Sequence, residues 1–595
     1  MISLHRLLTV ALIFLLFAGL IPFANAERLT PARLQSLPPD TSITALILMR
    51  ERPDLDDLRR KVSHLTRDQR SEVVWDELDV LAERSQYRIR KTLQQKIDAG
   101  IVETMRPLRI SNGIVVEAKP AAFTDVLEHP DILKVVHVMP RASDTDGVST
   151  ELRTAGDVQI PWHIDHIQAP QVWNAGYTGK GVLVAIIDTG INYTHVDLND
   201  HLWNGGTDYP KHGYDFADKD LDPIDESGHG AGVAGLVAGD GSAGIATGVA
   251  PDATVMGLRV RKDLYTGVVT DTWLAQDFAL EHGADVISMS LGWGSPGPED
   301  RPIWRERYEI LETAGIVCVK SAGNRRAQRT PPDAISVPGD VPSPWRNPDE
   351  VESGSRGGLI TVGGIDQSNH PTEVSSPGPV TWEDVAPWND YPLSDGRSGL
   401  IKPDICAPGI EGFSLPFNSD TTYAGFNNTS MAQPHVAGTV ALMLSKNFGL
   451  LPVQVDSILQ TTAFDLGVPG KDNDFGAGLV QAKAAVDAVP KPEAGPGDFP
   501  NDPGIPNGIA LDVIYPNPFN PWTKIRVILV DGGYLSVQVF NSVGRTVETL
   551  VDSVYYPPAT YDIPFDATGL ASGTYLVRAE LNGRDSVVSK ATYTK

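Results

Sequence analysis

Three short segments of this 595-residue chain each place a reactive side chain where a strand ends or a helix begins. Asp188 closes the apolar run AIID, His229 precedes a stretch of Gly, Ala and Val, and Ser430 opens a segment of helical character. Taken singly, each of them is as readily explained as a helix cap or a buried polar residue. In the order Asp, His, Ser they form one of the known arrangements of the hydrolytic triad.

The chemistry of such a triad needs more than three side chains, because attack on a carbonyl creates an oxyanion. Ser430 at a helix start is surrounded by N–H groups at the positive end of the helix dipole. Asn324 follows a buried strand in SAGN, where its amide is placed to donate a second hydrogen bond. We therefore expect His229 to act as base on Ser430, Asp188 to orient His229, and Asn324 to bind the oxyanion.

Residues 161–488 resemble the catalytic domain of the subtilisin-like serine proteases. The resemblance rests on the segments GKGVLVAIIDTGI, GHGAGVAG, GVAPDATVMGLRV, DVISMSLGWG, SAGN, IKPDICAPG and NTSMAQPHVAG. It implies a serine endopeptidase acting on protein or peptide substrates, with Asp188, His229, Ser430 and Asn324 as its catalytic residues. It also implies a chemistry that requires no cofactor.

The chain departs from the family pattern at positions close to these residues. Ala231-Gly232 stand where Thr-His is usual, Asn428 replaces a Gly, and Gln433 replaces Thr or Ser. None of these changes removes a triad group. They leave open an alternative, a catalytically weak or inactive surface-binding protein that keeps the fold. A dinucleotide-binding enzyme is disfavoured because no Gly-x-Gly-x-x-Gly follows the first strand.

The resemblance also indicates how a substrate is held. Residues 288–294, SMSLGWG, are similar to a strand edge that pairs with an extended peptide. The implied substrate-binding residues are Ser290, Leu291, Gly292, Trp293, Ala322 and Gly323. We hypothesise that Trp293, where the family often has Gly, narrows the primary pocket or forms a hydrophobic ledge, and that Arg325 favours acidic substrate side chains. For both residues a plain surface side chain is the alternative.

Nearly continuous apolar runs must position these residues. They lie at 182–188, 253–260, 285–290, 316–323 and 359–365, with helical stretches between them. Runs of this kind are typical of strands buried on both faces. The sequence therefore predicts an α/β fold with a doubly wound, mainly parallel sheet over residues 158–489.

The N-terminal part is expected to hold two separate segments. Residues 1–26 have a short apolar run and the cleavage pattern Ala-Asn-Ala, which predict a signal peptide. Residues 27–157 read as an α+β module, with strands at 44–53, 113–120 and 132–140, a helix over 56–99 that Gly100 ends, and an exposed linker from 141. The module resembles the propeptide of the same family. It is thus expected to act as an intramolecular inhibitor that self-cleavage between about 139 and 160 removes.

The C-terminal part differs from the preceding segment in composition and in its hydrophobic pattern. Residues 490–510 are rich in Pro, Gly and Asp and predict a linker, and residues 511–595 alternate as in a β-sandwich. YPNPFNP, GR and SGTY resemble the sorting domain of type IX secretion substrates. The resemblance implies an outer-membrane secretion machinery as partner and a secreted or cell-surface protein of a Gram-negative bacterium, with a plain adhesive domain as the alternative.

Charge and composition exclude several other classes. The net charge of −26 disfavours nucleic acid as a partner, since phosphate contacts need clustered Lys and Arg. The two cysteines, Cys318 and Cys406, are too few for a disulfide scaffold, and two buried thiols are expected. The acidic run 215–226 reads as a solvated loop, with a cation site as the alternative. Structural Ca²⁺ is compatible with the family resemblance, but no ligands can be assigned.

Overall fold

The computed structural model describes residues 27–491 except 64, 140, 143–147, 155–158, 264–265, 268, 295–298, 351–353 and 394–397, and residues 509–594 except 516–518, 520, 530–532, 542–544, 557–558 and 583–584. The expected signal peptide and most of the expected linker 490–510 lie outside these residues. The chain separates into two compact units, Met1–Pro490 and Lys491–Lys595.

The N-terminal module pairs an antiparallel sheet with a long helix. The strands, in the order β1-β5-β2-β4-β3, are Glu27–Arg28 (β1), Ile43–Met49 (β2), Val102–Leu108 (β3), Gly113–Ala118 (β4) and Ile132–His137 (β5). Its helices are Pro31–Ser36 (α2), Leu55–Val62 (α3), Arg67–Asp98 (α4) and the 3₁₀ turn Pro120–Phe123 (η1). The single helix predicted over 56–99 is divided, because Thr66 begins α4 and its N–H donates to the Gln69 side chain at 3.2 Å.

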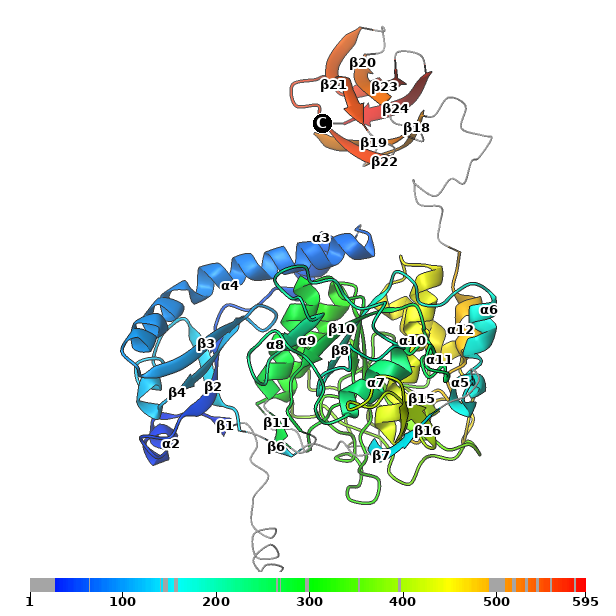
Figure 1. The fold of residues 1–595 in the computed structure, drawn as a ribbon. Helices are drawn as coiled ribbons and strands as arrows, with labels where there is room; N and C mark the ends of the chain where they lie inside the picture. The colour runs from blue at the N-terminus through cyan, green and yellow to red at the C-terminus, as the bar shows by residue number, and fades with distance from the viewer. Residues whose placement is uncertain are drawn as a thin grey trace, which may run out of the picture. The chain divides into compact units, whose positions relative to one another are not determined.

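Helix α4 lies along the sheet of its own module and extends over the catalytic part (Figure 1). In its first turn the buried Arg67 lies 3.1 Å from the carboxylate of Asp285. Further along, Leu78 belongs to the same buried core as Trp273. The module and the catalytic part therefore share one apolar core.

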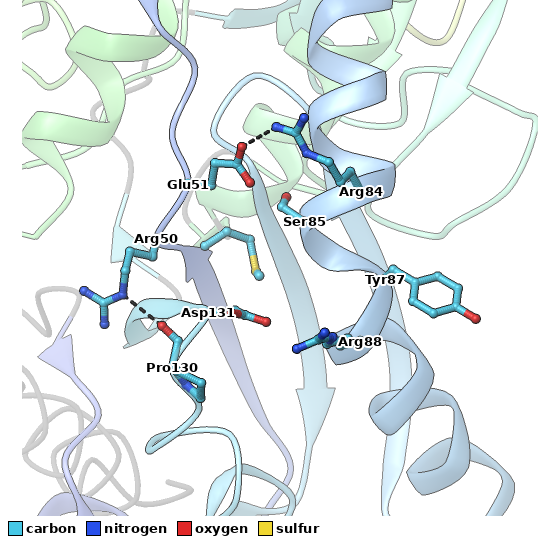
Figure 2. A pocket seen from close by; sticks show the side chains of 9 residues that line it. Arg50, Glu51, Arg84, Ser85, Tyr87, Arg88, Pro130 and Asp131 are labelled. Carbon is cyan, nitrogen blue, oxygen red and sulfur yellow. Dashed lines mark hydrogen bonds and ion pairs between the residues drawn. The ribbon is translucent and has the colours of Figure 1, made fainter.

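A pocket of about 530 Å³ lies between α4 and the sheet of the module (Figure 2). Arg84 of α4 pairs with Glu51 across it, and Arg50 donates to the Pro130 carbonyl at 2.9 Å. All of its lining residues belong to the N-terminal module. This pocket is therefore distinct from the segments that carry the predicted triad.

A seven-stranded parallel sheet forms the centre of the catalytic part, in the order β15-β14-β13-β12-β8-β10-β9. Its strands are Leu183–Asp188 (β8), Gly213–Asp215 (β9), Thr254–Arg259 (β10), Val286–Met289 (β12), Val317–Ser321 (β13), Leu359–Ile365 (β14) and Ile405–Pro408 (β15). The five predicted runs are confirmed as strands. The edge strands β9 and β15 were not predicted, because at 3 and 4 residues they are too short to show a pattern.

Helices cover both faces of this sheet, as alternate side chains of β8 demonstrate. Val184 and Ile186 pack in one core with His229–Ala238 (α7) and Thr429–Lys446 (α10), whereas Ala185 and Ile187 pack in another with Val269–Glu281 (α8) and Arg301–Thr313 (α9). The remaining helices are Trp162–His166 (α5), Ala169–Asn174 (α6), Pro452–Thr462 (α11) and Ala482–Ala488 (α12). The doubly wound α/β architecture is thus confirmed.

The segment after the N-terminal module is not the unstructured linker that its sequence predicted. Arg141–Ala142 (β6) pairs with Thr266–Gly267 (β11), and Val148–Arg153 (β7) pairs with Tyr423–Phe426 (β17), which also pairs with Gly412–Ser414 (β16). These strands have no hydrophobic pattern of their own. Their partners are distant in sequence and supply the backbone hydrogen bonds, which is why periodicity missed them.

The C-terminal unit consists of two antiparallel sheets around an apolar core, in the orders β18-β19-β22 and β21-β20-β23-β24. Its strands are Ile509–Tyr515 (β18), Trp522–Leu529 (β19), Gly533–Phe540 (β20), Thr546–Tyr556 (β21), Ala559–Asp566 (β22), Gly573–Leu581 (β23) and Asp585–Tyr593 (β24). Side chains of β20 alternate between buried and partly exposed positions. The period-two pattern is therefore confirmed as a β-rich unit.

Cys318 and Cys406 are buried free thiols, as expected. They lie on β13 and β15, which β14 separates, and burial raises the pKa of both thiols. Within the described residues, no helix combines the length and the apolar character that crossing a bilayer requires.

Candidate active site

Two of the predicted triad residues are in direct contact at the carboxyl end of the central sheet. Asp188 is the last residue of β8 and His229 the first of α7, and Nδ1 of His229 lies 2.7 Å from Oδ1 of Asp188. Both side chains are fully buried. The Asp188 Oδ1 atom also accepts the Thr189 N–H at 2.8 Å. With Nδ1–H donating to the carboxylate, Nε2 of His229 is left with the lone pair that a general base needs.

The loop before α7 fixes this pair through a carboxylate that the sequence did not single out. Asp225 accepts the hydroxyl of Thr189 at 3.0 Å and the N–H of Ala231 at 2.8 Å. Burial raises the pKa of its carboxyl group, and backbone N–H donors oppose that shift. The run 215–226 is therefore not simply a solvated loop, since Asp225 holds the start of α7 against the end of β8.

A glycine allows this close approach. An ideal Cβ at Gly230 would lie 2.0 Å from the carbonyl oxygen of Gly190, in the loop that follows Asp188. No side chain fits at that distance, so the first turn of α7 can meet the end of β8 only with glycine at this position. The small-residue stretch after His229 has this packing role.

Ser430 lies in the first turn of α10, which packs on α7. Its Oγ donates to the carbonyl of Ser290 at 3.4 Å. Among the described residues, Nε2 of His229 has no hydrogen-bond partner, so no bond joins the hydroxyl to the imidazole. The structure thus brings Asp188 and His229 into contact and places Ser430 at the helix start expected for it, with its hydroxyl turned to Ser290.

Asn324, the predicted oxyanion donor, is hydrogen-bonded to the residue that precedes Ser430. Its Oδ1 accepts two hydrogen bonds from Thr429, from the hydroxyl at 2.8 Å and from the N–H at 3.2 Å. The Oδ1 end of the amide is thereby anchored to the residue beside the predicted nucleophile. Thr429 was not identified from the sequence; its position next to the serine was the available signal.

Gln433, one of the departures from the family pattern, forms a buried link beneath the nucleophile. Its Oε1 accepts the hydroxyls of Ser290 at 2.8 Å and Ser288 at 3.1 Å, and its Nε2 donates to the Val319 carbonyl at 3.2 Å. These bonds connect α10 to β12 and β13. The longer side chain therefore replaces the usual Thr or Ser with a complete set of partners.

At a second departure from the family pattern, Gly232, an aromatic ring packs directly against the backbone. An ideal Cβ at Gly232 would lie 2.5 Å from the ring of Phe426. That ring in turn lies 5.5 Å from the imidazole of His229, centroid to centroid. Phe426 therefore occupies the space that a side chain at position 232 would take.

The third departure, Asn428, is conformationally strained. Its φ of 72° and ψ of −169° lie in a region that essentially only glycine adopts. We expect Asn428→Gly to raise the free energy of unfolding by about 1 kcal/mol. The substitution relieves the backbone strain of the folded chain, and this gain exceeds the entropy that glycine adds to the unfolded chain. Thermal melting of both chains in the Ser430→Ala background measures it.

The matched control for that substitution is Asn389→Gly. Asn389 also has positive φ, at 46°, but is exposed and distant in sequence from Ser430. If Asn428→Gly melts no higher than the parent, the backbone at this position is not strained.

The expected substrate segment is only partly as predicted. Leu291 and Trp293 are buried in the core, and the Trp293 ring lies 5.6 Å from that of Trp304. Trp293 is therefore not the plain surface side chain given as the alternative, and its effect on the primary pocket stays a prediction. Gly292, Ala322 and Gly323 are also buried, and ideal Cβ atoms at the two glycines would both contact Ser336.

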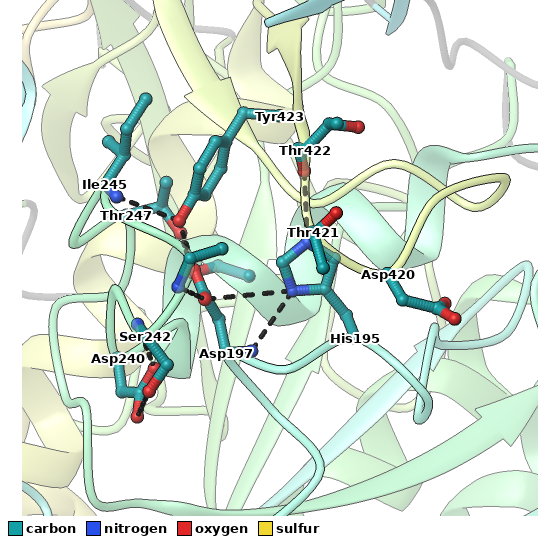
Figure 3. A network of polar contacts seen from close by, with 12 residues as sticks. His195, Asp197, Asp240, Ser242, Ile245, Thr247, Asp420, Thr421, Thr422 and Tyr423 are labelled. Carbon is teal, nitrogen blue, oxygen red and sulfur yellow. Dashed lines mark hydrogen bonds and ion pairs between the residues drawn. The ribbon is translucent and has the colours of Figure 1, made fainter. Parts of the chain in front are cut away.

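His195 holds two loops together through hydrogen bonds (Figure 3). Its Nε2 lies 3.0 Å from the Thr422 carbonyl oxygen, and its Nδ1 accepts the Asp197 N–H at 3.1 Å. The Asp197 carboxylate accepts the Tyr423 hydroxyl at 2.7 Å and the Ala243 N–H at 2.5 Å. These bonds tie the loop before β17 to the loop after α7. No group of three or more His, Cys, Asp or Glu in the described part is arranged to hold a metal ion.

A buried histidine pair joins α10, the helix that carries Ser430, to α5. His435 Nε2 lies 2.8 Å from His163 Nδ1, and His435 Nδ1 lies 2.7 Å from the Met431 carbonyl oxygen. Burial lowers the pKa of His435 to about 4, and burial and the neighbouring His435 lower that of His163. Both rings are therefore neutral in the folded chain at neutral pH.

This pair predicts acid sensitivity. The unfolded chain binds protons at His435 below its ordinary pKa of 6.5, whereas the folded chain does not until about pH 4, so stability falls as pH falls through that window. The expected contribution is about 3 kcal/mol. Urea unfolding in the Ser430→Ala background measures the free energy of unfolding at pH 7 and at pH 4. Between these two pH values, the chain with His435→Asn is expected to lose less of this free energy than the chain that keeps His435. The exposed His370→Asn serves as control, and an equal loss in all chains contradicts the expectation.

The part of the chain that holds these residues matches known proteins. The family model described as Subtilase family matches residues 179–478. Subtilisin Savinase of Lederbergia lenta is 33% identical over 328 residues, which cover 55% of this chain and 98% of that protein. Subtilisin E of Bacillus subtilis (strain 168) is 33% identical over 334 residues, covering 55% of this chain and 71% of that protein.

The C-terminal unit has a match of its own. The family model described as Secretion system C-terminal sorting domain covers residues 513–592, and this domain directs type IX substrates to secretion or to the cell surface. The Subtilase match spans half of the chain and includes every residue of the predicted triad. The chain therefore belongs to the subtilase family.

Proposed function

We propose that the chain is a secreted serine endopeptidase made as a self-processing zymogen. Its family and its subtilisin relatives support a serine protease that needs no cofactor for catalysis. The observation that carries the proposal is the 2.7 Å contact between His229 Nδ1 and Asp188 Oδ1, in a fully buried pair at the carboxyl end of β8. In open α/β sheets, sites form at this end of the strands.

In the proposed mechanism His229 acts first as base and then as acid. Its Nε2 takes the proton of Ser430 as Oγ attacks the substrate carbonyl, and the same proton then passes to the leaving amine. Asp188 holds the ring in the required tautomer and stabilises the imidazolium. Water repeats the sequence on the acyl-enzyme and releases the acid product. Before the first attack, the Ser430 hydroxyl must rotate away from the Ser290 carbonyl and toward Nε2 of His229.

The oxyanion is stabilised by the Asn324 amide and the Ser430 backbone N–H. We expect Asn324→Ala to lower kcat by about 10²–10³-fold, because one preorganised donor is lost where charge develops. Initial rates on a fluorogenic peptide measure it, with exposed Asn204→Ala as control. A kcat unchanged by Asn324→Ala contradicts this role.

The zymogen part of the proposal is supported by the path of the chain. Strand β6 ends at Ala142 beside β11, and β7 begins at Val148 beside β17, which immediately precedes α10. Both flanking strands of this junction are thus tied to the catalytic part, and β17 leads directly into the helix that carries Ser430. We infer that the N-terminal module inhibits the site until its junction is cut, and that this cut falls between Ala142 and Val148.

A fluorophosphonate probe, which reacts only with an activated serine, tests the proposal. Labelling of the processed protein that is lost in Ser430→Ala and kept in the exposed Ser368→Ala supports the endopeptidase. Processed wild-type protein that takes up no probe contradicts it and favours the catalytically silent binding protein instead.

A further inference from the structure

The N-terminal module contacts the catalytic part at the end of the sheet opposite to the predicted triad. The buried Arg67 begins α4, and its Nε donates to the Gly315 carbonyl at 2.8 Å. One Nη donates to the Asp285 carbonyl at 2.6 Å, and the other lies 3.1 Å from the Asp285 carboxylate. Asp285 directly precedes β12 and Gly315 lies just before β13, whereas Asp188 ends β8. Because these strands are parallel, the contacts of Arg67 lie at their amino ends.

The acceptors of Arg67 are held in place by the sheet itself. The Asp285 Oδ2 atom accepts the Leu183 N–H at 2.7 Å, and the Asp285 carbonyl also accepts the Val317 N–H at 3.0 Å. All three residues belong to the catalytic part, so these bonds orient the acceptors without help from the module. An ideal Cβ at Gly315 would lie 3.0 Å from Arg67 Cγ, so glycine leaves the room that the arginine needs. A site that is ordered before its ligand arrives costs less to fill.

The contacts suit a guanidinium group. Its planar fork reaches two carbonyl oxygens and one carboxylate at once, which a single ammonium nitrogen does less well. The Phe448 ring centroid lies 5.0 Å from Arg67 Cζ, in the range of cation–π contacts. Burial raises the pKa of the Asp285 carboxyl group, and Arg67 opposes that shift. A cavity of about 380 Å³, lined in part by Arg67, Asp285, Gly315 and Phe448, gives small molecules access to this place.

The module is thus tied to the catalytic part at two separate places. One is its junction, where β6 pairs with β11 and β7 pairs with β17. The other is the start of α4 with Arg67, beside α3, whose Leu58 and Val62 are buried in the same core as Tyr308 of α9. A cut in the junction between β6 and β7 breaks the chain but leaves the contacts of Arg67 in place.

We propose that the amino ends of β12 and β13 form a guanidinium-binding site, and that Arg67 in this site keeps the N-terminal module on the catalytic part after the junction is cut. The inference rests on the proposed zymogen function and adds how the inhibitor is retained. Cleavage and release of the module are then two separate steps, and Arg67 sets the rate of the second. Once the module leaves, the Asp285 carboxylate and the Gly315 carbonyl can accept another guanidinium group.

An added protease makes the cut independently of Ser430. In the Ser430→Ala background, residues 143–147 are replaced by the recognition sequence of a site-specific protease, so every chain is cut at the same place. The remainder of the chain is immobilised, and surface plasmon resonance records the dissociation of the N-terminal fragment. Arg67→Ala is expected to release this fragment about a hundred-fold faster than the parent, because truncating one partner of a buried charge pair acts on the dissociation rate.

The matched control is Arg60→Ala. The Arg60 side chain is 75% exposed on α3 and pairs with Asp57 of the same helix, so its loss is expected to leave the dissociation rate unchanged. Equal acceleration by Arg60→Ala contradicts the site. Arg67→Lys, which keeps the charge but loses the planar fork, is expected to give a rate between those of the parent and Arg67→Ala. This variant also tests the site should Arg67→Ala fail to fold.

Small cations distinguish a guanidinium site from a general loss of packing. Millimolar propylguanidinium is expected to occupy the space that Arg67→Ala vacates, which slows release of the fragment and raises the melting temperature of the uncut chain. Propylammonium at the same concentration is expected to do neither, since it lacks the fork. The same dissociation rate for the parent and Arg67→Ala, or an equal effect of the two cations, overturns the site.

These measurements need no activity of the chain itself. Absence of fluorophosphonate labelling therefore overturns the endopeptidase alone, and the dissociation rates decide the guanidinium site alone.

Discussion

Replacement of Ser430 by alanine is expected to lower the rate of peptide hydrolysis about 10⁶-fold, the scale set by the same removal in subtilisin. Without the Ser430 hydroxyl no acyl-enzyme forms, and His229 and Asp188 then have no nucleophile to activate. The substitution removes a single atom from a residue whose Oγ makes one weak bond, at 3.4 Å, to the Ser290 carbonyl. The fold is therefore expected to survive the change.

The measurement compares initial rates on a fluorogenic peptide at equal protein concentration. Ser368→Ala, an exposed serine of the catalytic part, controls for the substitution itself and is expected to keep full activity. A melting temperature within a few degrees of the parent establishes that the Ser430→Ala chain is folded. Residual activity above a few percent means that another group attacks the substrate.

Asp188→Asn is expected to produce the second largest loss, about 10⁴-fold in kcat at neutral pH. Asp188 Oδ1 lies 2.7 Å from Nδ1 of His229, and this contact selects the tautomer with its lone pair on Nε2. An amide at this place can present its NH₂ group to Nδ1, which favours the other tautomer. It also removes the charge that stabilises the imidazolium.

The rate of fluorophosphonate labelling distinguishes this role from a loss of structure. It is expected to fall with the same factor as kcat, while the melting temperature changes little because the shape of the side chain is retained. Asp252→Asn, an exposed aspartate before β10, is the matched control. Labelling at the wild-type rate contradicts the assignment of Asp188 to the triad.

Much of the fold could be predicted because short segments of the sequence indicate its strands. Continuous apolar runs identified β8, β10, β12, β13 and β14, since a strand buried on both faces needs apolar residues at every position. Asp188, His229, Ser430 and Asn324 each stand at a strand end or a helix start, which the sequence also reveals. Their type and order then predicted the chemistry.

What the sequence concealed depends on contacts between distant residues. Strands β6 and β7 form only because β11 and β17 lie beside them, and neither has an apolar period. The bonds of Gln433 to Ser288 and Ser290, more than 100 residues away in the chain, likewise have no local signature. The burial of Trp293 likewise has no local signature, because only its packing against Trp304 reveals that the ring turns inward.

Intact-mass spectrometry of the purified wild-type chain beside Ser430→Ala tests the central claim most directly. If Ser430 cuts its own chain, the wild type yields two fragments that separate between Ala142 and Val148, and the alanine variant stays joined there. The same cleavage in both chains, or an uncut junction in the wild type, would contradict the account.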